Sequence, residues 1–179
     1  MEVRRARHRS EHGAAAVEFA LVVPLLVVLL FGTVTAGMAY SDHLGITNAV
    51  REGARFGSAM PYQQAAPLPV ITPAQWADSV RTRVQQVYFN AGSSVTTDQI
   101  CVKLVDSTDT GITGASALGT QCGVEPTLPS GMTTGSCVVK VWVSRPETIQ
   151  LVIAPTLSFN IGAKSVSYYG LTTGSCAAS

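Results

Sequence analysis

A long apolar run dominates the N-terminal part of the chain. Residues 13–39 contain one charged side chain, that of Glu18, among residues that are otherwise apolar, small or uncharged. A helix needs about 20 consecutive, predominantly apolar residues to cross a bilayer. The run therefore predicts a transmembrane helix at about residues 14–39.

The helical pattern continues beyond this run, with apolar residues at intervals near three or four. They are Leu44, Ala49, Val50 and Ala54. Gly57 and Pro61 then supply signals that end a helix. We therefore expect one helix over residues 14–57, with its first part in lipid and its second part in water.

A second, amphipathic helix follows a proline-containing linker at residues 58–72. Thr72 and Gln75 have the spacing of a capping box, and Pro73 suits the first helical turn. The apolar positions that follow lie on one helix face. They are Trp76, Ala77, Val80, Val84, Val87 and Tyr88. This pattern predicts a helix that ends near residue 90 and buries its tryptophan face.

Beyond this helix the apolar residues alternate with a period of two. Residues 100–105 and 138–144 alternate in this way, and so do residues 157–161. Such alternation is typical of half-buried strands. The alternation shifts phase at Gly162, which predicts a β-bulge there.

Polar residues between and within these strands have simple structural interpretations. Residues 106–136 are rich in Ser, Thr and Gly, and we predict a long loop in which turns account for Asp106 and Asp109. Three lysines alternate with apolar residues on the predicted strands, and we expect them on solvated faces. These lysines are Lys103, Lys140 and Lys164.

The elements together predict an α+β fold. A long N-terminal transmembrane helix continues outside the membrane, and a second amphipathic helix packs on a small antiparallel sheet of three or four strands. The predicted segments are a basic cytoplasmic leader at residues 1–13, the N-terminal helix at 14–57, the linker at 58–72 and an extracytoplasmic domain at 73–179.

Charge is distributed unevenly and sets the expected topology. Residues 1–13 hold four of the 12 basic and two of the 11 acidic residues, which leaves eight and nine for the rest. A basic flank keeps its side of a membrane helix in the cytoplasm. We therefore expect a single-pass protein of the cytoplasmic membrane with its C-terminal domain outside. The near-neutral remainder argues against a nucleic-acid partner, because such binding relies on a basic surface.

All four cysteines fall in the predicted extracytoplasmic domain. They are Cys101, Cys122, Cys137 and Cys176. They contain no CxxC pair and are far in sequence from the three histidines, so the spacing of a metal site is absent. An even number of cysteines in an exported domain predicts two disulfides, for which three connectivities are possible.

Catalysis is not expected from this sequence. Two histidines lie in the leader and His43 lies at the membrane exit, so none is placed to serve a nucleophile in the domain. The chain contains no HExxH, GxSxG, P-loop or GxGxxG motif. We predict a protein that is not an enzyme and needs no cofactor.

Glu18 requires an explanation because a carboxylate in hydrocarbon costs about 2.5–3.5 kcal/mol on insertion scales. One interpretation is that Glu18 lies one turn inside the boundary and reaches the headgroups. The other is that a second chain supplies a cation. A free α-amino group, created by a cut just after Gly13, would be such a cation.

The stretch GAAAVEF at residues 13–19 and the stretch NAVREGARF at residues 48–56 together resemble the TadE-like family. These are minor pilins (pseudopilins) of the Tad/Flp tight-adherence branch of type IV pilus machinery. The residues of the second stretch that carry the likeness are Arg51, Glu52, Gly53, Ala54 and Arg55. Within it, Glu52 has the spacing to pair with Arg55 on a helix.

The resemblance implies a processing site and an assembly contact. A prepilin peptidase would cut between Gly13 and Ala14, and Glu18, followed by Phe19, would contact a neighbouring subunit through the Ala14 amine. The implied partners are the peptidase, other pilin or pseudopilin subunits and the Tad assembly machinery. The implied role is structural, in pilus assembly and surface adherence, with possible incorporation into a pilus.

Two alternatives remain open at this point. The chain could be a signal-anchored surface binding domain with no filament role, which would keep its leader. It could also be a secreted domain, because residues 37–39 offer a small-x-small site for a cut before Tyr40.

Overall fold

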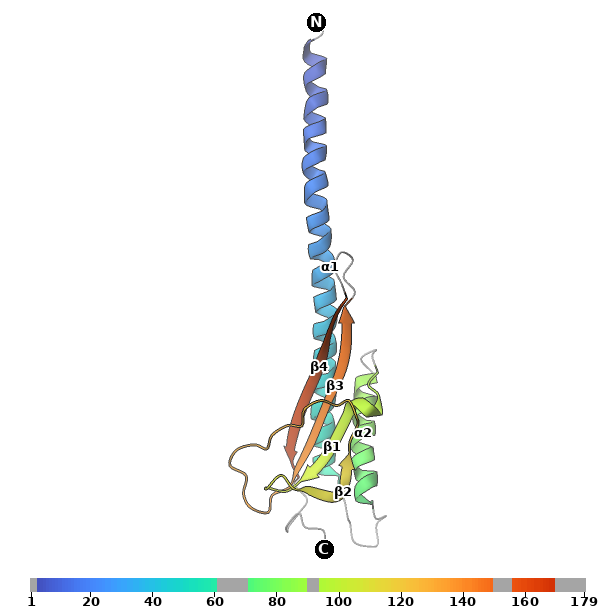
Figure 1. The fold of residues 1–179 in the computed structure, drawn as a ribbon, viewed down its shortest axis with the longest axis vertical. Coiled ribbons are helices and arrows are strands. Elements are labelled where there is room, and N and C mark those ends of the chain that lie inside the picture. Colours follow the sequence, from blue (N-terminus) through green and yellow to red (C-terminus); the bar gives the residue numbers. More distant parts are fainter. Residues whose placement is uncertain (1–2, 61–70, 90–93, 150–155, 170–179) are drawn as a thin grey trace. The chain divides into compact units, whose positions relative to one another are not determined.

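We describe the fold from a computed structural model, for residues 3–60, 71–89, 94–149 and 156–169. The chain divides into two compact units, 1–40 and 41–179. The elements are α1 (Val3–Ala59), α2 (Pro73–Phe89), the short 3₁₀ helix η1 (Thr97–Gln99), β1 (Ile100–Val105), β2 (Gly111–Ala117), β3 (Val138–Ile149) and β4 (Leu157–Tyr168) (Figure 1). This confirms the predicted α+β fold.

The first unit consists of the N-terminal part of α1. The helix begins at Val3, so residues 3–13 of the predicted leader are helical. Helix α1 also continues through Pro24. The large apolar side chains of this unit are exposed, as at Phe19 and Leu21.

The second unit contains an antiparallel sheet in the order β2-β1-β3-β4. Two predictions about it were wrong. The range 106–136, predicted as a loop, contains β2, an edge strand with little apolar alternation. Gly162 pairs with Ser144 in an uninterrupted register, so β4 has no bulge there, and the register shift lies between β1 and β2 instead.

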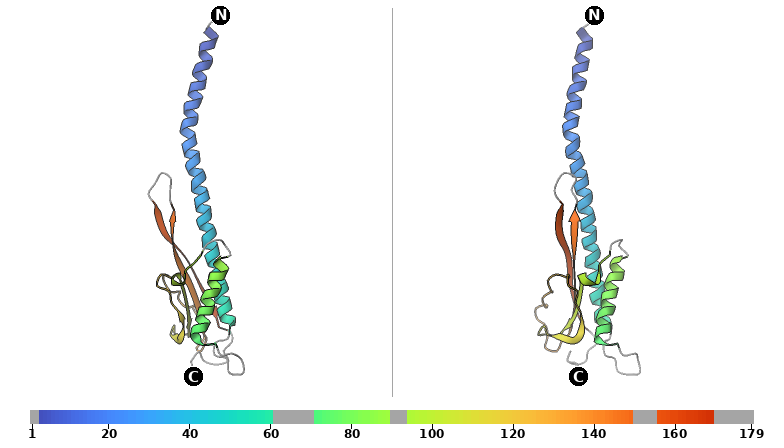
Figure 2. Two further views of the ribbon diagram at one scale, coloured as in Figure 1. Left: turned by 90° about the vertical axis from the view of Figure 1, so that its right-hand side faces the viewer. Right: turned by 45° about the vertical axis from the view of Figure 1, so that its right-hand side comes forward.

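The core lies between one face of the sheet and two helical segments, α2 and residues 41–59 of α1 (Figure 2). The predicted apolar face of α2 is confirmed, with Trp76, Val80 and Val84 fully buried. The α1 segment adds Ile46, Ala49, Val50 and Ala54 to the same core.

The predicted start of α2 is confirmed by its hydrogen bonds. The Gln75 N–H donates to Thr72 Oγ1 at 3.2 Å, and the Thr72 N–H donates to Gln75 Oε1 at 3.0 Å. This reciprocal pair is a capping box, which satisfies backbone donors that the first turn leaves open. Helix α2 is thereby fixed at the end where Trp76 enters the core.

The opposite face of the sheet is covered in part by the segment after β2. Cys101, Cys122 and Trp142 form a small buried cluster there. Lys140 is completely buried on this face, and Lys103 is partly buried. The expectation of solvated faces was therefore wrong for these two lysines, although Lys164 is exposed as expected.

Candidate functional site

The predicted processing and assembly residues lie on one exposed stretch of helix in the first unit. Gly13, Ala14, Glu18 and Phe19 are all helical and exposed. Ala14 and Glu18 are four residues apart, so they lie on the same helix face about one turn from each other. Among the side chains that the structure describes, no cation lies within ion-pair distance of Glu18. The carboxylate is thus available to a group from another chain.

The apolar part of α1 has the length and composition of a membrane span. It contains a window of 18 residues with a mean hydropathy of 2.7, none of it buried inside the protein. It is the one helix of this kind in the described part of the chain. A single membrane span and a signal sequence both have these properties.

The second half of the candidate family motif lies in the second unit and has a packing role. Gly53 and Ala54 face the core, whereas Arg51 and Arg55 are exposed. A β-carbon on Gly53 would overlap a methyl group of Val84 on α2. Only glycine therefore lets α1 approach α2 this closely without a rearrangement.

Gly57 repeats this close approach one turn later. A β-carbon there would lie 2.9 Å from Val80 Cγ2 and 3.1 Å from Val139 Cγ1. The Gly57 carbonyl also accepts a hydrogen bond from the Trp76 indole N–H at 3.1 Å. Gly57 was predicted to help end the helix, but the helix extends to Ala59, and Gly57 serves in packing.

An ionic contact joins the two helices beside Gly53. Glu52 accepts hydrogen bonds from Arg83 at 2.9 Å and from Arg55 at 3.1 Å. These bonds, that from Arg83 first, hold the pKa of the Glu52 carboxyl below its usual value. The pair with Arg55 is confirmed, but Arg83 lies 31 residues away and was not predicted. The Arg83 guanidinium also lies 5.9 Å from the centre of the Phe56 ring.

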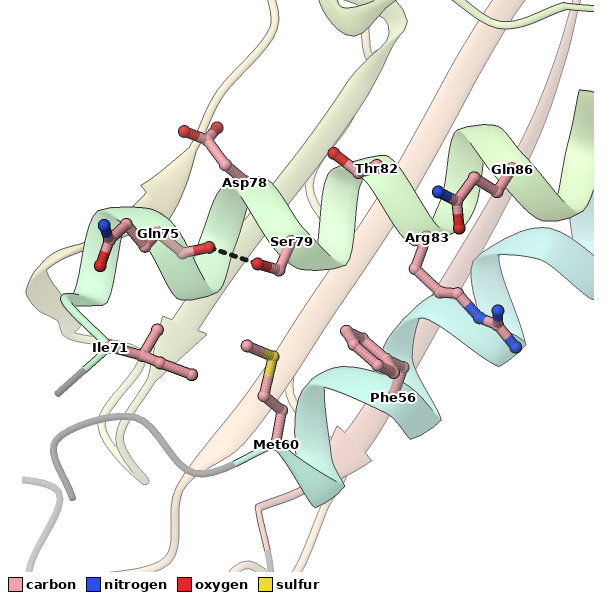
Figure 3. Close-up of a pocket in the computed structure, with 9 residues that line it drawn as sticks. All are labelled: Phe56, Met60, Ile71, Gln75, Asp78, Ser79, Thr82, Arg83 and Gln86. Carbon is pink, nitrogen blue, oxygen red and sulfur yellow. Dashed lines mark hydrogen bonds between the residues drawn. The ribbon is translucent and has the colours of Figure 1, made fainter. Parts of the chain in front are cut away.

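An open hollow of about 760 Å³ lies between the end of α1 and α2 (Figure 3). Apolar side chains line the α1 side, and Ser79, Thr82 and Gln86 line the α2 side (Figure 3). Of the hydroxyls that line it, that of Ser79 donates to the Gln75 backbone carbonyl at 2.7 Å rather than to a base. In the described residues, no group of three or more His, Cys, Asp or Glu side chains is placed to hold a metal ion.

A disulfide joins β1 to the segment after β2. It links Cys101 and Cys122, whose Cα atoms are 5.7 Å apart. Of the three connectivities that the sequence permits, one contains this pair. Cys137 is disulfide-bonded as well, and Cys176 lies outside the described residues.

An ionic cluster lies on the same sheet face. Buried Lys140 donates hydrogen bonds to Asp109 and, at 2.9 Å, to Glu125. Lys103, the cross-strand neighbour of Lys140, donates to the same Glu125 at 3.3 Å. A buried ammonium needs such partners to offset its lost hydration.

Asp106 takes the predicted turn role by accepting the N–H groups of Thr108 and Thr110. Asp109 lies in the same turn, with a positive φ of 67° and its N–H donated to the Asp106 carbonyl, and its side chain joins this turn to the sheet.

Part of the chain is similar to a known protein family. Residues 13–55 match the family described as TadE-like protein. Neither a curated protein nor a solved structure matches the chain. The match covers the predicted processing and assembly residues and the Gly53 contact, and it ends before the linker and the sheet.

Proposed function

Because the chain carries a TadE-like domain at residues 13–55, we propose that it is a minor pilin (pseudopilin)-like structural protein of a Tad/Flp pilus system. In this role it takes part in pilus assembly and surface adherence.

The observation that carries the proposal is where the family match lies. It begins at Gly13, includes the exposed apolar helix with Glu18, and continues into the segment that packs through Gly53. A simple anchor needs only the apolar helix. A match that extends across both parts supports a helix that has a role on each side of the membrane boundary. A subunit of an assembly requires such a helix.

Processing is the first step of the proposed role. A prepilin peptidase in the membrane would cut after Gly13 and leave Ala14 as the new N-terminus. The small, exposed side of the helix at these residues supports access to the bond, since a β-carbon at Gly13 would have no atom within 4 Å. The cut would also remove the basic leader.

Assembly is the second step. The new α-amino group of Ala14 on one subunit would pair with the Glu18 carboxylate of its neighbour. A salt bridge within hydrocarbon is favoured over two separate charges, because each isolated charge is costly there. The pair would set the axial offset between adjacent helices, and the domain of residues 41–179 would be extracytoplasmic.

The test is the N-terminal residue of the mature protein, isolated from its native membrane. We expect it to be Ala14. An N-terminus that retains the leader would leave a surface domain on an uncut anchor, and a start at Tyr40 would mean a secreted domain. Either result would overturn the proposed processing.

A further inference from the structure

Strand β4 carries a stripe of apolar residues on one face. The core covers one end of this stripe and leaves the other end exposed. Residues 157, 159, 161 and 163 lie on the same face of this strand, because its pairing with β3 is uninterrupted. Ile161 and Ala163 are 5% and 9% exposed, whereas Leu157 and Phe159 are 55% and 36% exposed. The core face of the strand therefore continues as an uncovered apolar surface.

The uncovered part belongs to a section of the β3–β4 hairpin that extends past α2. Helix α2 ends at Phe89, and Tyr88 just before it accepts a hydrogen bond from Arg145 at 2.6 Å. Arg145 pairs with Ile161, but the strands remain paired as far as Ile149 and Leu157. Leu157 and Phe159 thus lie on the side of Arg145 away from the core.

The direction of this section follows from the contacts of α1. Gly57 lies next to Val139 and Gly53 next to Val141, so β3 runs antiparallel to this part of α1. From Val139 to Ile149 the strand rises about 33 Å. From Gly57 back to Ser41 the helix rises about 24 Å. The paired end of the hairpin therefore reaches at least as far as Ser41, the first residue of this unit.

The end of this section carries no charged side chain. Residues 148–161 contain no Asp, Glu, Lys, Arg or His. The next charged residue on β3, Glu147, is the cross-strand partner of Phe159 and is paired with Arg145 at 2.8 Å. Contact with lipid at Leu157 and Phe159 would therefore bring no unpaired charge to the lipid surface, and an unpaired charge is the main cost of entering a bilayer.

We propose that the end of the β3–β4 hairpin is a second membrane contact, made by Leu157 and Phe159. The proposal rests on the membrane anchoring proposed above. Lipid is the occupant because this end of the unit is the one to which the apolar helix is attached through Tyr40. The contact would fix the face that the domain turns toward the bilayer by adding a second point of attachment to the one at Tyr40.

The experiment uses tryptophan as a depth probe in the full chain, reconstituted in nanodiscs with and without brominated acyl chains, which quench tryptophan on contact. Phe159→Trp places the probe at the proposed contact. Tyr168→Trp is the matched control, because Tyr168 is an exposed aromatic residue at the opposite end of the same strand. Phe31→Trp places a probe in the apolar helix. The unsubstituted chain gives the background from buried Trp76 and Trp142.

We expect brominated lipid to quench the probes at positions 31 and 159 and to leave the probe at 168 at background. If the probe at 31 is quenched but those at 159 and 168 remain equal, the anchor stands and the hairpin contact is overturned. That result would favour a neighbouring protein as the occupant. If the probe at 31 is not quenched, the membrane anchoring itself is overturned, and the hairpin contact with it.

Discussion

The two parts of α1 are one helix by backbone but differ in what their side chains meet. In residues 13–40 the large apolar side chains are exposed, and a β-carbon at Gly32 or Gly37 would have no atom within 4 Å. In residues 41–59 the inward apolar side chains are buried, and Gly53 and Gly57 are in close contact. The apolar side chains of one helix therefore face the surroundings in its first part and the protein core in its second part.

The difference between the two parts follows from how apolar and charged residues are distributed around the helix. The first part is apolar on all faces, as a helix surrounded by lipid must be. The second part is apolar on one face and carries Arg51, Glu52 and Arg55 elsewhere. A substitution of the same kind should therefore lower the stability of the domain in the second part and leave it unchanged in the first part. This expectation gives a series of tests.

The largest expected effect is that of Trp76→Ala. Trp76 is fully buried against the second part of α1 and donates its indole N–H to Gly57. Removing a core tryptophan typically costs about 3–5 kcal/mol. Phe31→Ala, in the exposed first part, is the control and should leave the free energy of unfolding unchanged. Denaturant unfolding of the full chain in detergent, followed by the circular dichroism of the sheet, measures both. Equal losses would contradict the distinction.

The next effect is expected from glycine. Gly53→Leu places a side chain where Val84 already lies, and overpacking of this kind costs about 1–3 kcal/mol. Gly37→Leu adds the same atoms where the protein leaves space, so we expect no loss of stability. The same unfolding measurement compares them. If Gly53→Leu proved as stable as Gly37→Leu, close packing would not explain the glycine.

A smaller effect is expected from the ionic contact between α1 and α2. Because Arg83 and Arg55 lower the pKa of Glu52, the folded state binds this proton less readily than the unfolded state does. The contribution to stability is therefore present above the usual carboxyl pKa and is lost as the pH falls through the lowered value. For a pair at the surface we expect about 0.2–1 kcal/mol.

The matched variant is Glu52→Gln, which keeps the size of the side chain but cannot titrate. Stability measured from neutral to acidic pH should fall less steeply in this variant than in the unsubstituted chain. Parallel curves for the two proteins would show that Glu52 contributes nothing to the pH dependence, and the helices would then be held by packing alone.

These tests also mark how far the sequence could predict the structure. The tryptophan face of α2 and the two inner strands follow from periodicity, because each buries one continuous face. The membrane-type run follows instead from its length and its unbroken apolar composition. The strand β2 was missed because its residues, from Gly111 to Ala117, are small and mostly exposed. The phase shift in the sequence of β4 led to the wrong prediction of a bulge. Ser165, Val166 and Ser167 are all half-buried, so apolar and polar residues do not mark opposite faces of the strand there.

Contacts between distant segments could not be predicted from the sequence pattern. Alternation placed Lys140 on the outer face of the sheet but could not show that Asp109 and Glu125 would come to cover it. The pairing of Glu52 with Arg83 likewise depends on how α1 crosses α2. The processing and assembly residues at 13–19 were predicted from the cost of the Glu18 carboxylate in hydrocarbon and from the family resemblance. Their roles stay predictions.

The smallest expected effect on stability comes from Glu18, and here the comparison is with function. Glu18→Ala removes a group that is costly in lipid, so the protein should remain inserted and should unfold as before. Its co-purification with other pilus subunits and piliation should nonetheless decrease, because the neighbouring Ala14 amine would lose its partner. Glu18→Gln is the control that keeps length and removes charge, and it should behave like Glu18→Ala if the salt bridge is the contact. If both variants assemble normally, Glu18 takes no part in assembly, and the first part of α1 serves only as an anchor.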